Sequence, residues 1–144
     1  MKTESSIGAI GNNEKSSTNP ILFISLGSIF WAEGVLLIRF WGEQLFFNSN
    51  PWLLLWFGLS IPISWVLVKT GATIGKVKGS DILTATVIMS ITALLLDGIG
   101  LTWFQNWYGT KPTQLLLAAA WLLWGVGVSL AIGYWESRHD VSEY

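Results

Sequence analysis

The stretch that decides the fold is ILTATVIMSITALLLDGIGLTWF, residues 82–104, which is long, apolar and carries one ionisable side chain, Asp97. A helix needs about 20 mostly apolar residues to cross the hydrocarbon core of a bilayer. This stretch has that length and lacks the alternation of a transmembrane β-strand. Ser80 and Asp81, which precede it, are good N-cap residues. The stretch therefore predicts a membrane-spanning α-helix.

Three further apolar stretches flank this one, so the chain has four predicted spans: residues 21–40, 52–69, 82–104 and 113–135. Pro20, Pro51 and Pro112 lie at the starts of the other three, where proline is tolerated at a helix beginning. Pro62 lies inside the second span and is expected to kink it. The predicted fold class is all-α, with a four-transmembrane-helix bundle over residues 20–136.

The composition excludes several classes of protein. Of the 144 residues, 51% are hydrophobic and 12% charged, about half the usual charged fraction of roughly 25%. A chain without cysteine has no disulfide or thiolate site, and a net charge of −1 gives no footprint for nucleic acid. His139 is the one histidine. We expect no enzyme, no catalytic residues, no cofactor and no metal site.

Residues 1–19 and 137–144 are polar and predict a disordered N-terminal tail and a short C-terminal tail. Lysine and arginine mark the cytoplasmic side of membrane proteins. Six of the eight lie in the two tails or the loop between the second and third spans, and two lie on the other side. The six are Lys2, Lys15, Lys69, Lys76, Lys78 and Arg138, and the two are Arg39 and Lys111. Both termini are therefore predicted to be cytoplasmic, with the loop lysines touching anionic lipid.

Three ionisable residues form a candidate intramembrane polar site: Glu33, Arg39 and Asp97. With a rise of about 1.5 Å per residue, they lie roughly 18, 27 and 22 Å from the inner ends of their spans. Asp97 is thus level with the gap between Glu33 and Arg39. Arg39 is expected either to pair with Asp97 or to extend to the headgroups.

Asp97 shares a helical stripe of small and polar residues with Thr86, Ser90, Ala93 and Gly100, so it is predicted to face the bundle interior. Two interpretations stay open: a buried polar clasp that fixes packing, or a proton or cation site. Glu33 lies among large apolar side chains. It is expected either to be neutral and donate a hydrogen bond, or to bind a proton.

The fourth span carries small residues at four-residue steps, Gly125, Ser129 and Gly133, which favour close helix–helix contact. This contact lies either within the bundle or between two copies in a homodimer. Four-helix bundles have tightly packed interiors, so little room for a permeation path is expected.

Three segments resemble a bacterial family of small four-helix membrane proteins known as a domain of unknown function. They are LIRFWGEQLFF (37–47), LLLDG (94–98) followed by Trp103 and Phe104, and AWLLWG (120–125). The resemblance covers roughly residues 21–134. It implies bacterial origin, four spans, and Arg39 and Asp97 as motif positions, but no activity.

A second segment, GSIFWAEG (27–34), resembles the first helix of small multidrug-resistance transporters. In that family an embedded glutamate binds a proton or a cationic drug in turn, within an antiparallel dimer, which would make Glu33 the coupling residue. The long tail, Arg39, Asp97 and the biased charges depart from the family pattern.

We expect an integral inner-membrane protein with a structural or accessory role. The alternative is a small proton-coupled transporter that uses Glu33. In both cases the expected partners of the protein are the lipid bilayer and either a second copy of the chain or a larger membrane complex.

Overall fold

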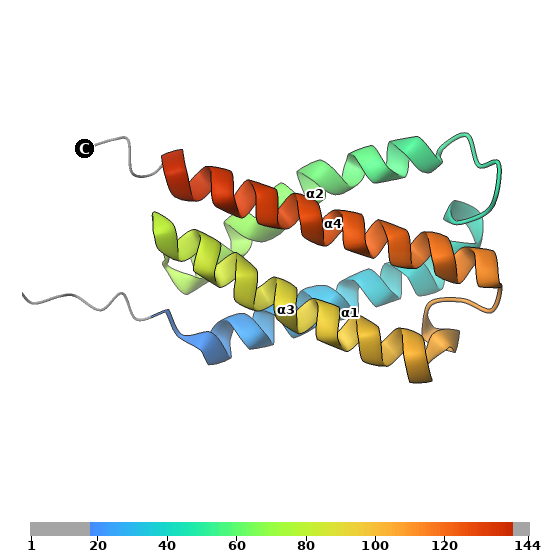
Figure 1. Cartoon of the computed structure of the whole chain (residues 1–144), viewed down its shortest axis with the longest axis horizontal. Helices are drawn as coiled ribbons and strands as arrows, with labels where there is room; N and C mark the ends of the chain where they lie inside the picture. Colours follow the sequence, from blue (N-terminus) through green and yellow to red (C-terminus); the bar gives the residue numbers. More distant parts are fainter. Residues whose placement is uncertain (1–17, 140–144) are drawn as a thin grey trace, which may run out of the picture.

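The computed structural model describes residues 18–139, which form a bundle of long α-helices (Figure 1). These are α1 (Pro20–Leu45), α2 (Leu53–Gly75), α3 (Ser80–Trp103) and α4 (Pro112–His139), with a short 3-10 helix η1 (Gln105–Trp107) before α4. No strand occurs within the described range. All four α-helices are long and apolar enough to cross a membrane, so the predicted all-α fold class is confirmed. The predictions for residues 1–17 and 140–144 lie outside the described residues.

The helices extend beyond the apolar stretches that predicted them. Asn19, placed in the tail by its polarity, caps α1, because its side chain accepts a hydrogen bond from the Ile21 N–H at 3.1 Å. At the other end α1 continues to Leu45, where Gly42 and Leu45 are buried in the bundle. α2 continues to Gly75 and ends at Lys76. Hydropathy marks the membrane-embedded part of a helix, whereas capping and packing determine its ends.

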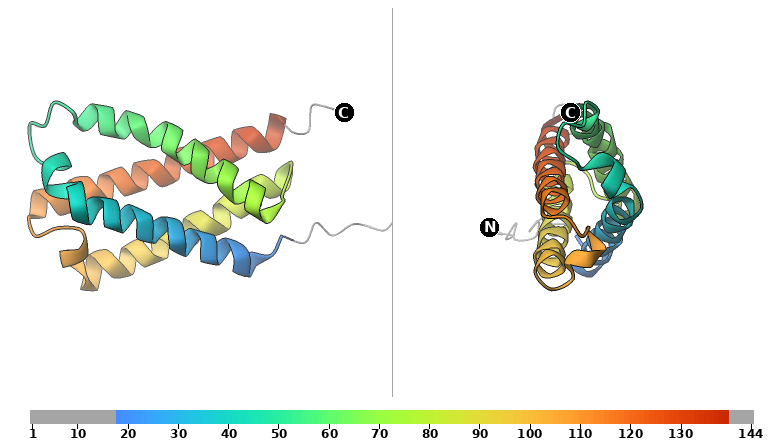
Figure 2. Two further views of the ribbon diagram at one scale, coloured as in Figure 1. Left: turned by 180° about the vertical axis from the view of Figure 1, so that it is seen from behind. Right: turned by 90° about the vertical axis from the view of Figure 1, so that its right-hand side faces the viewer.

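The helices run along one axis and alternate in direction (Figures 1 and 2). Both ends of the described chain and the loop between α2 and α3 lie at one end of the bundle, and the other two connections lie at the opposite end. Seen end-on, α3 and α4 form one layer and α1 and α2 the other (Figure 2). The main contacts join α1 to α3, α3 to α4, and α2 to α4.

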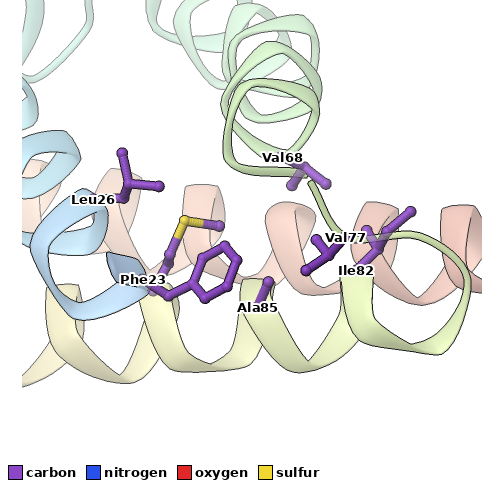
Figure 3. Close-up of a cluster of buried hydrophobic side chains, with 7 residues drawn as sticks. Phe23, Leu26, Val68, Val77, Ile82 and Ala85 are labelled. Atoms are coloured by element: carbon purple, nitrogen blue, oxygen red, sulfur yellow. The ribbon is translucent and has the colours of Figure 1, made fainter. Parts of the chain in front are cut away.

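The apolar core is divided into two clusters, one toward each end of the bundle. The cluster nearer the chain termini consists of Phe23, Leu26, Val68, Val77, Ile82, Ala85 and Met89 (Figure 3). The cluster at the opposite end consists of Val35, Ile38, Leu45, Phe46, Tyr108, Ala118 and Trp121. Between them, the middle of the bundle is lined by a mixture of small residues and larger aromatic and aliphatic side chains.

Two tryptophans attach α4 to α2 through the backbone. The Trp121 indole N–H donates to the Trp56 carbonyl at 3.2 Å, and the Trp124 indole N–H donates to the Phe57 carbonyl at 3.0 Å. Both carbonyls lie just before the Gly58 carbonyl, which lacks its helical donor because Pro62 inside α2 has no N–H. In lipid, backbone groups need protein partners, so these indoles fix the helix pair as well as fill space.

Candidate functional site

Among the acidic and basic side chains of residues 18–139, the buried one is Asp97 on α3, which is 6% exposed. Its Oδ1 accepts hydrogen bonds from the Trp31 indole N–H of α1 at 2.9 Å and from the Tyr108 hydroxyl at 2.8 Å. The Trp31 N–H also lies 3.1 Å from the Tyr108 hydroxyl oxygen. The prediction that Asp97 faces the interior is confirmed. We call these three residues the Asp97 clasp.

Tyr108 reaches Asp97 because the neighbouring turn of α3 carries no side chain at Gly100. A Cβ on Gly100 would lie 2.6 Å from the Tyr108 hydroxyl. Tyr108 is fully buried although it follows η1 in a connecting segment. Burial, and then the hydrogen bond to Asp97, raise the pKa of Tyr108 far above its usual value. The hydroxyl is therefore protonated at neutral pH and acts as a hydrogen-bond donor to the carboxylate.

Asp97 also lines a cavity of about 230 Å³ in the middle of the bundle. All four helices contribute to its wall, which is mostly apolar with serine and threonine hydroxyls among the lining groups. Trp31 of α1 and Trp121 of α4 provide aromatic surface. Asp97 Oδ2 accepts no hydrogen bond from any residue between 18 and 139. The cavity is thus a mostly apolar space whose lining includes Asp97, a residue with one carboxylate oxygen that has no hydrogen-bond donor in this range.

Small residues on facing helices create this space. A Cβ built on Gly125 would meet no atom within 4 Å, so the cavity begins at the α4 backbone itself. Opposite it, the Ser64 hydroxyl of α2 donates to the Gly125 carbonyl at 3.2 Å. Ser90 and Ser129 also line the cavity. The expectation of a tightly packed interior is therefore wrong for the middle of the bundle, because small residues face one another there on several helices.

Of the three charged residues that sequence analysis had grouped, the structure keeps Glu33 and Asp97 on one cavity and places Arg39 elsewhere. Glu33 lies on the lining of the same cavity as Asp97, on the exposed side of α1. Arg39 is exposed and donates to the Asn106 carbonyl, which links the end of α1 to η1. The predicted Arg39–Asp97 ion pair is wrong. Within the described range, the one ion pair joins Lys69 to Glu136, and Asp97 is directed to Trp31 and Tyr108. Matching depth placed Arg39 and Asp97 at similar heights but gave no information on their directions around the helix axes.

The small residues of α4 take two different positions. Gly133 packs against α3, where a Cβ would lie 2.8 Å from the Thr86 Oγ1 and 2.9 Å from its Cβ. Gly125 and Ser129 instead line the cavity. All three face the interior of this bundle, and the homodimer stays a prediction without structural support from them.

Sequence analysis did not identify Trp31 and Tyr108 as partners of Asp97. They lie 66 and 11 residues from it in the chain, and aromatic residues near span ends ordinarily indicate interface anchors. The sequence did contain one indication for Trp31. It lies one turn from both Gly27 and Gly34, and glycines on one face of a helix favour close contact with a neighbouring helix.

The arrangement is suited to holding a positive charge. Two donors on Oδ1 stabilise a carboxylate anion, and a cation in the cavity could approach Oδ2 and the aromatic faces. No group of three or more histidine, cysteine or acidic residues able to hold a metal occurs in the described part of the chain. A single positive charge on an organic body fits this chemistry better than a multiply coordinated metal ion.

Comparison with known proteins gives a family but no activity. No curated protein and no solved structure matches the chain significantly. The resemblance to small multidrug-resistance transporters receives no support from these comparisons. A protein-family model, described as "Family of unknown function (DUF5367)", matches residues 45–140 and so includes Asp97 and Tyr108. Because this match covers more than half of the chain, the protein belongs to that family of unknown function, and its four apolar helices make it a membrane protein.

Proposed function

We propose that the protein binds a small organic cation within the membrane, in the cavity that Asp97 lines. One observation carries the proposal, namely the environment of Asp97, which is 6% exposed and lines the cavity. Its Oδ1 accepts two hydrogen bonds, whereas its Oδ2 accepts none from residues 18–139. A charge at bilayer depth costs about 2.5–3.5 kcal/mol on insertion scales, so ionisable residues there usually mark functional positions.

The size and lining of the cavity indicate the class of ligand. A cavity of about 150 Å³ in another protein accommodates benzene, and the cavity here is about 230 Å³. The space therefore suits an amine with one ring or a short alkyl chain. Its ammonium would lie near Asp97 and its apolar body near Trp31 and Trp121, where cation–π attraction adds to the ion pair.

Filling the cavity tests this proposal. In detergent-purified protein, we expect Gly125→Leu to weaken binding of benzylammonium about 10–100-fold in calorimetric titration, because the new side chain enters the ligand's space. Gly127→Leu is the matched control: Gly127 also has open space around a built Cβ, but it is exposed and does not line the cavity. Equal binding by the wild type and both variants would refute the cavity as the site.

A structural or accessory role in a larger membrane complex is our second proposal, together with the absence of enzymatic activity. It is compatible with a packing role for Asp97, because the Asp97 clasp joins α1, α3 and the segment before α4 through hydrogen bonds within the chain. Affinity isolation from native membranes distinguishes the two. A stoichiometric complex would favour the accessory role, whereas a lone protein or homodimer that binds amines would favour the ligand-binding role.

A proton-coupled transporter is a further form of the ligand-binding proposal, in which Glu33 on the cavity lining binds a proton or the cation in turn. Unchanged amine flux into proteoliposomes after Glu33→Gln would remove this form. We also propose the bacterial plasma membrane as the location, with cytoplasmic termini. The support is the excess of lysine and arginine on the side of the termini.

A further inference from the structure

A second hollow lies away from the Asp97 cavity, at the end of the bundle where α2 ends and α3 begins. This groove of about 400 Å³ has an apolar floor and lysines on its rim. Its lining consists of Val68, Lys69, Ala72, Thr73, Lys76, Val77, Lys78, Ile82 and Glu136. Figure 3 shows Val68, Val77 and Ile82 together in the core that forms the floor. Because α2 and α3 span the membrane, this end of the bundle lies at headgroup depth.

The charges of the groove are only partly compensated. Lys69 forms an ion pair with Glu136 at 2.5 Å, and the Trp65 indole N–H donates to the other Glu136 oxygen at 3.3 Å. Lys76 and Lys78 form no ion pair within the described part of the chain. Three lysines and one glutamate line the groove, so its lining residues carry a net charge of +2.

The backbone fixes these two lysines on either side of a buried residue. Val77 is 8% exposed, and its N–H donates to the Ala72 carbonyl at 3.1 Å, so the loop is anchored to the end of α2. Lys76 adopts a left-handed conformation, with φ 52° and ψ 35°. Glycine is favoured at this position of a helix end, and a side chain there is strained. Such strained residues cluster at functional sites.

We infer that this groove binds the headgroup of an anionic phospholipid, with the phosphate between Lys76 and Lys78 and the acyl chains along the apolar floor. Basic pockets between transmembrane helices at headgroup depth are suited to anionic lipids. The apolar floor favours a membrane lipid over a free phosphate, because a soluble anion would leave it exposed. This site shares no residue with the Asp97 cavity, so each proposal can fail alone.

The test is lipid-dependent stabilisation of the full chain in a non-ionic detergent. We expect dioctanoyl phosphatidylglycerol to raise the melting temperature of the wild type, while dioctanoyl phosphatidylcholine has little effect, since a ligand stabilises the folded state that binds it. The double variant Lys76→Gln/Lys78→Gln should need about 30-fold more phosphatidylglycerol for the same shift, or about fivefold for each lysine. Lys111→Gln, at the opposite end of the bundle, should respond like the wild type.

Three outcomes would overturn the inference: equal shifts with the two lipids, an unaltered response in the double variant, or an equal effect of soluble glycerol phosphate. Lys76→Gly separates a lipid-binding role of Lys76 from a purely structural one. Glycine removes the left-handed strain, so the lipid-free melting temperature should rise by about 3 °C while the response to phosphatidylglycerol weakens. An undiminished lipid response in Lys76→Gly would exclude Lys76 from the site.

Discussion

Replacement of Gly27 by leucine is expected to lower the free energy of unfolding by about 3 kcal/mol. At Gly27 the backbones of α1 and α3 come close together: a Cβ there would lie 2.7 Å from the Met89 carbonyl oxygen and 3.0 Å from its Cα. Since these are backbone atoms, no side-chain rotation relieves the collision, and the two helices must separate. The change is measured as the shift of the unfolding midpoint in mild detergent.

The control is the same substitution at Gly127, where a built Cβ meets nothing within 4 Å and the residue is exposed. We expect that variant to stay within about 0.5 kcal/mol of the wild type, as for most surface changes. Equal destabilisation at the two positions would show that leucine is disfavoured for a reason other than the α1–α3 contact.

Replacement of Asp97 by asparagine is expected to weaken amine binding about 100-fold, or about 3 kcal/mol, with the fold intact. Asparagine keeps an oxygen that accepts from Trp31 and Tyr108, so the clasp persists, but it removes the negative charge that faces the ligand. Binding is measured by calorimetric titration of benzylammonium. Near-ultraviolet circular dichroism, which reports the tryptophan environments, should remain unchanged.

Replacement of Asp97 by leucine separates structure from binding. This change leaves the Trp31 and Tyr108 donors without their acceptor, at a cost of about 1–3 kcal/mol for each buried group. We therefore expect Asp97→Leu to lose both stability and binding, and Asp97→Asn to lose binding alone. If asparagine and leucine destabilise the protein equally while amine binding persists in the asparagine variant, the carboxylate has a structural role only.

The sequence was sufficient to predict the fold class and part of the site. Four long apolar stretches determine four helices, because a chain in lipid must satisfy its backbone hydrogen bonds internally. The small-residue stripe on α3 correctly predicted the burial of Asp97. These features depend on length and on periodicity within one helix, which a single sequence displays directly.

The cavity and the partners of Asp97 depend instead on how the helices face one another. Helical rise gave Arg39 and Asp97 similar depths, but the direction of Arg39 around α1 is toward Asn106. The indole of Trp31 and the hydroxyl of Tyr108 reach Asp97 only after α1 and the segment following η1 have packed on α3. The space beside Gly125 likewise arises from several helices together. The four-residue spacing of small residues on α4 could therefore predict only helix–helix contact, and not a cavity.

The central claim is that the bundle holds a cation beside Asp97, and one comparison tests it most directly. Benzylammonium and benzyl alcohol have nearly the same shape and differ in charge, so the ratio of their dissociation constants from the wild type at neutral pH reports the contribution of the ligand's positive charge. The account predicts that benzylammonium binds about 100-fold more tightly. Equal affinity for the two ligands, or no binding of either, would contradict it.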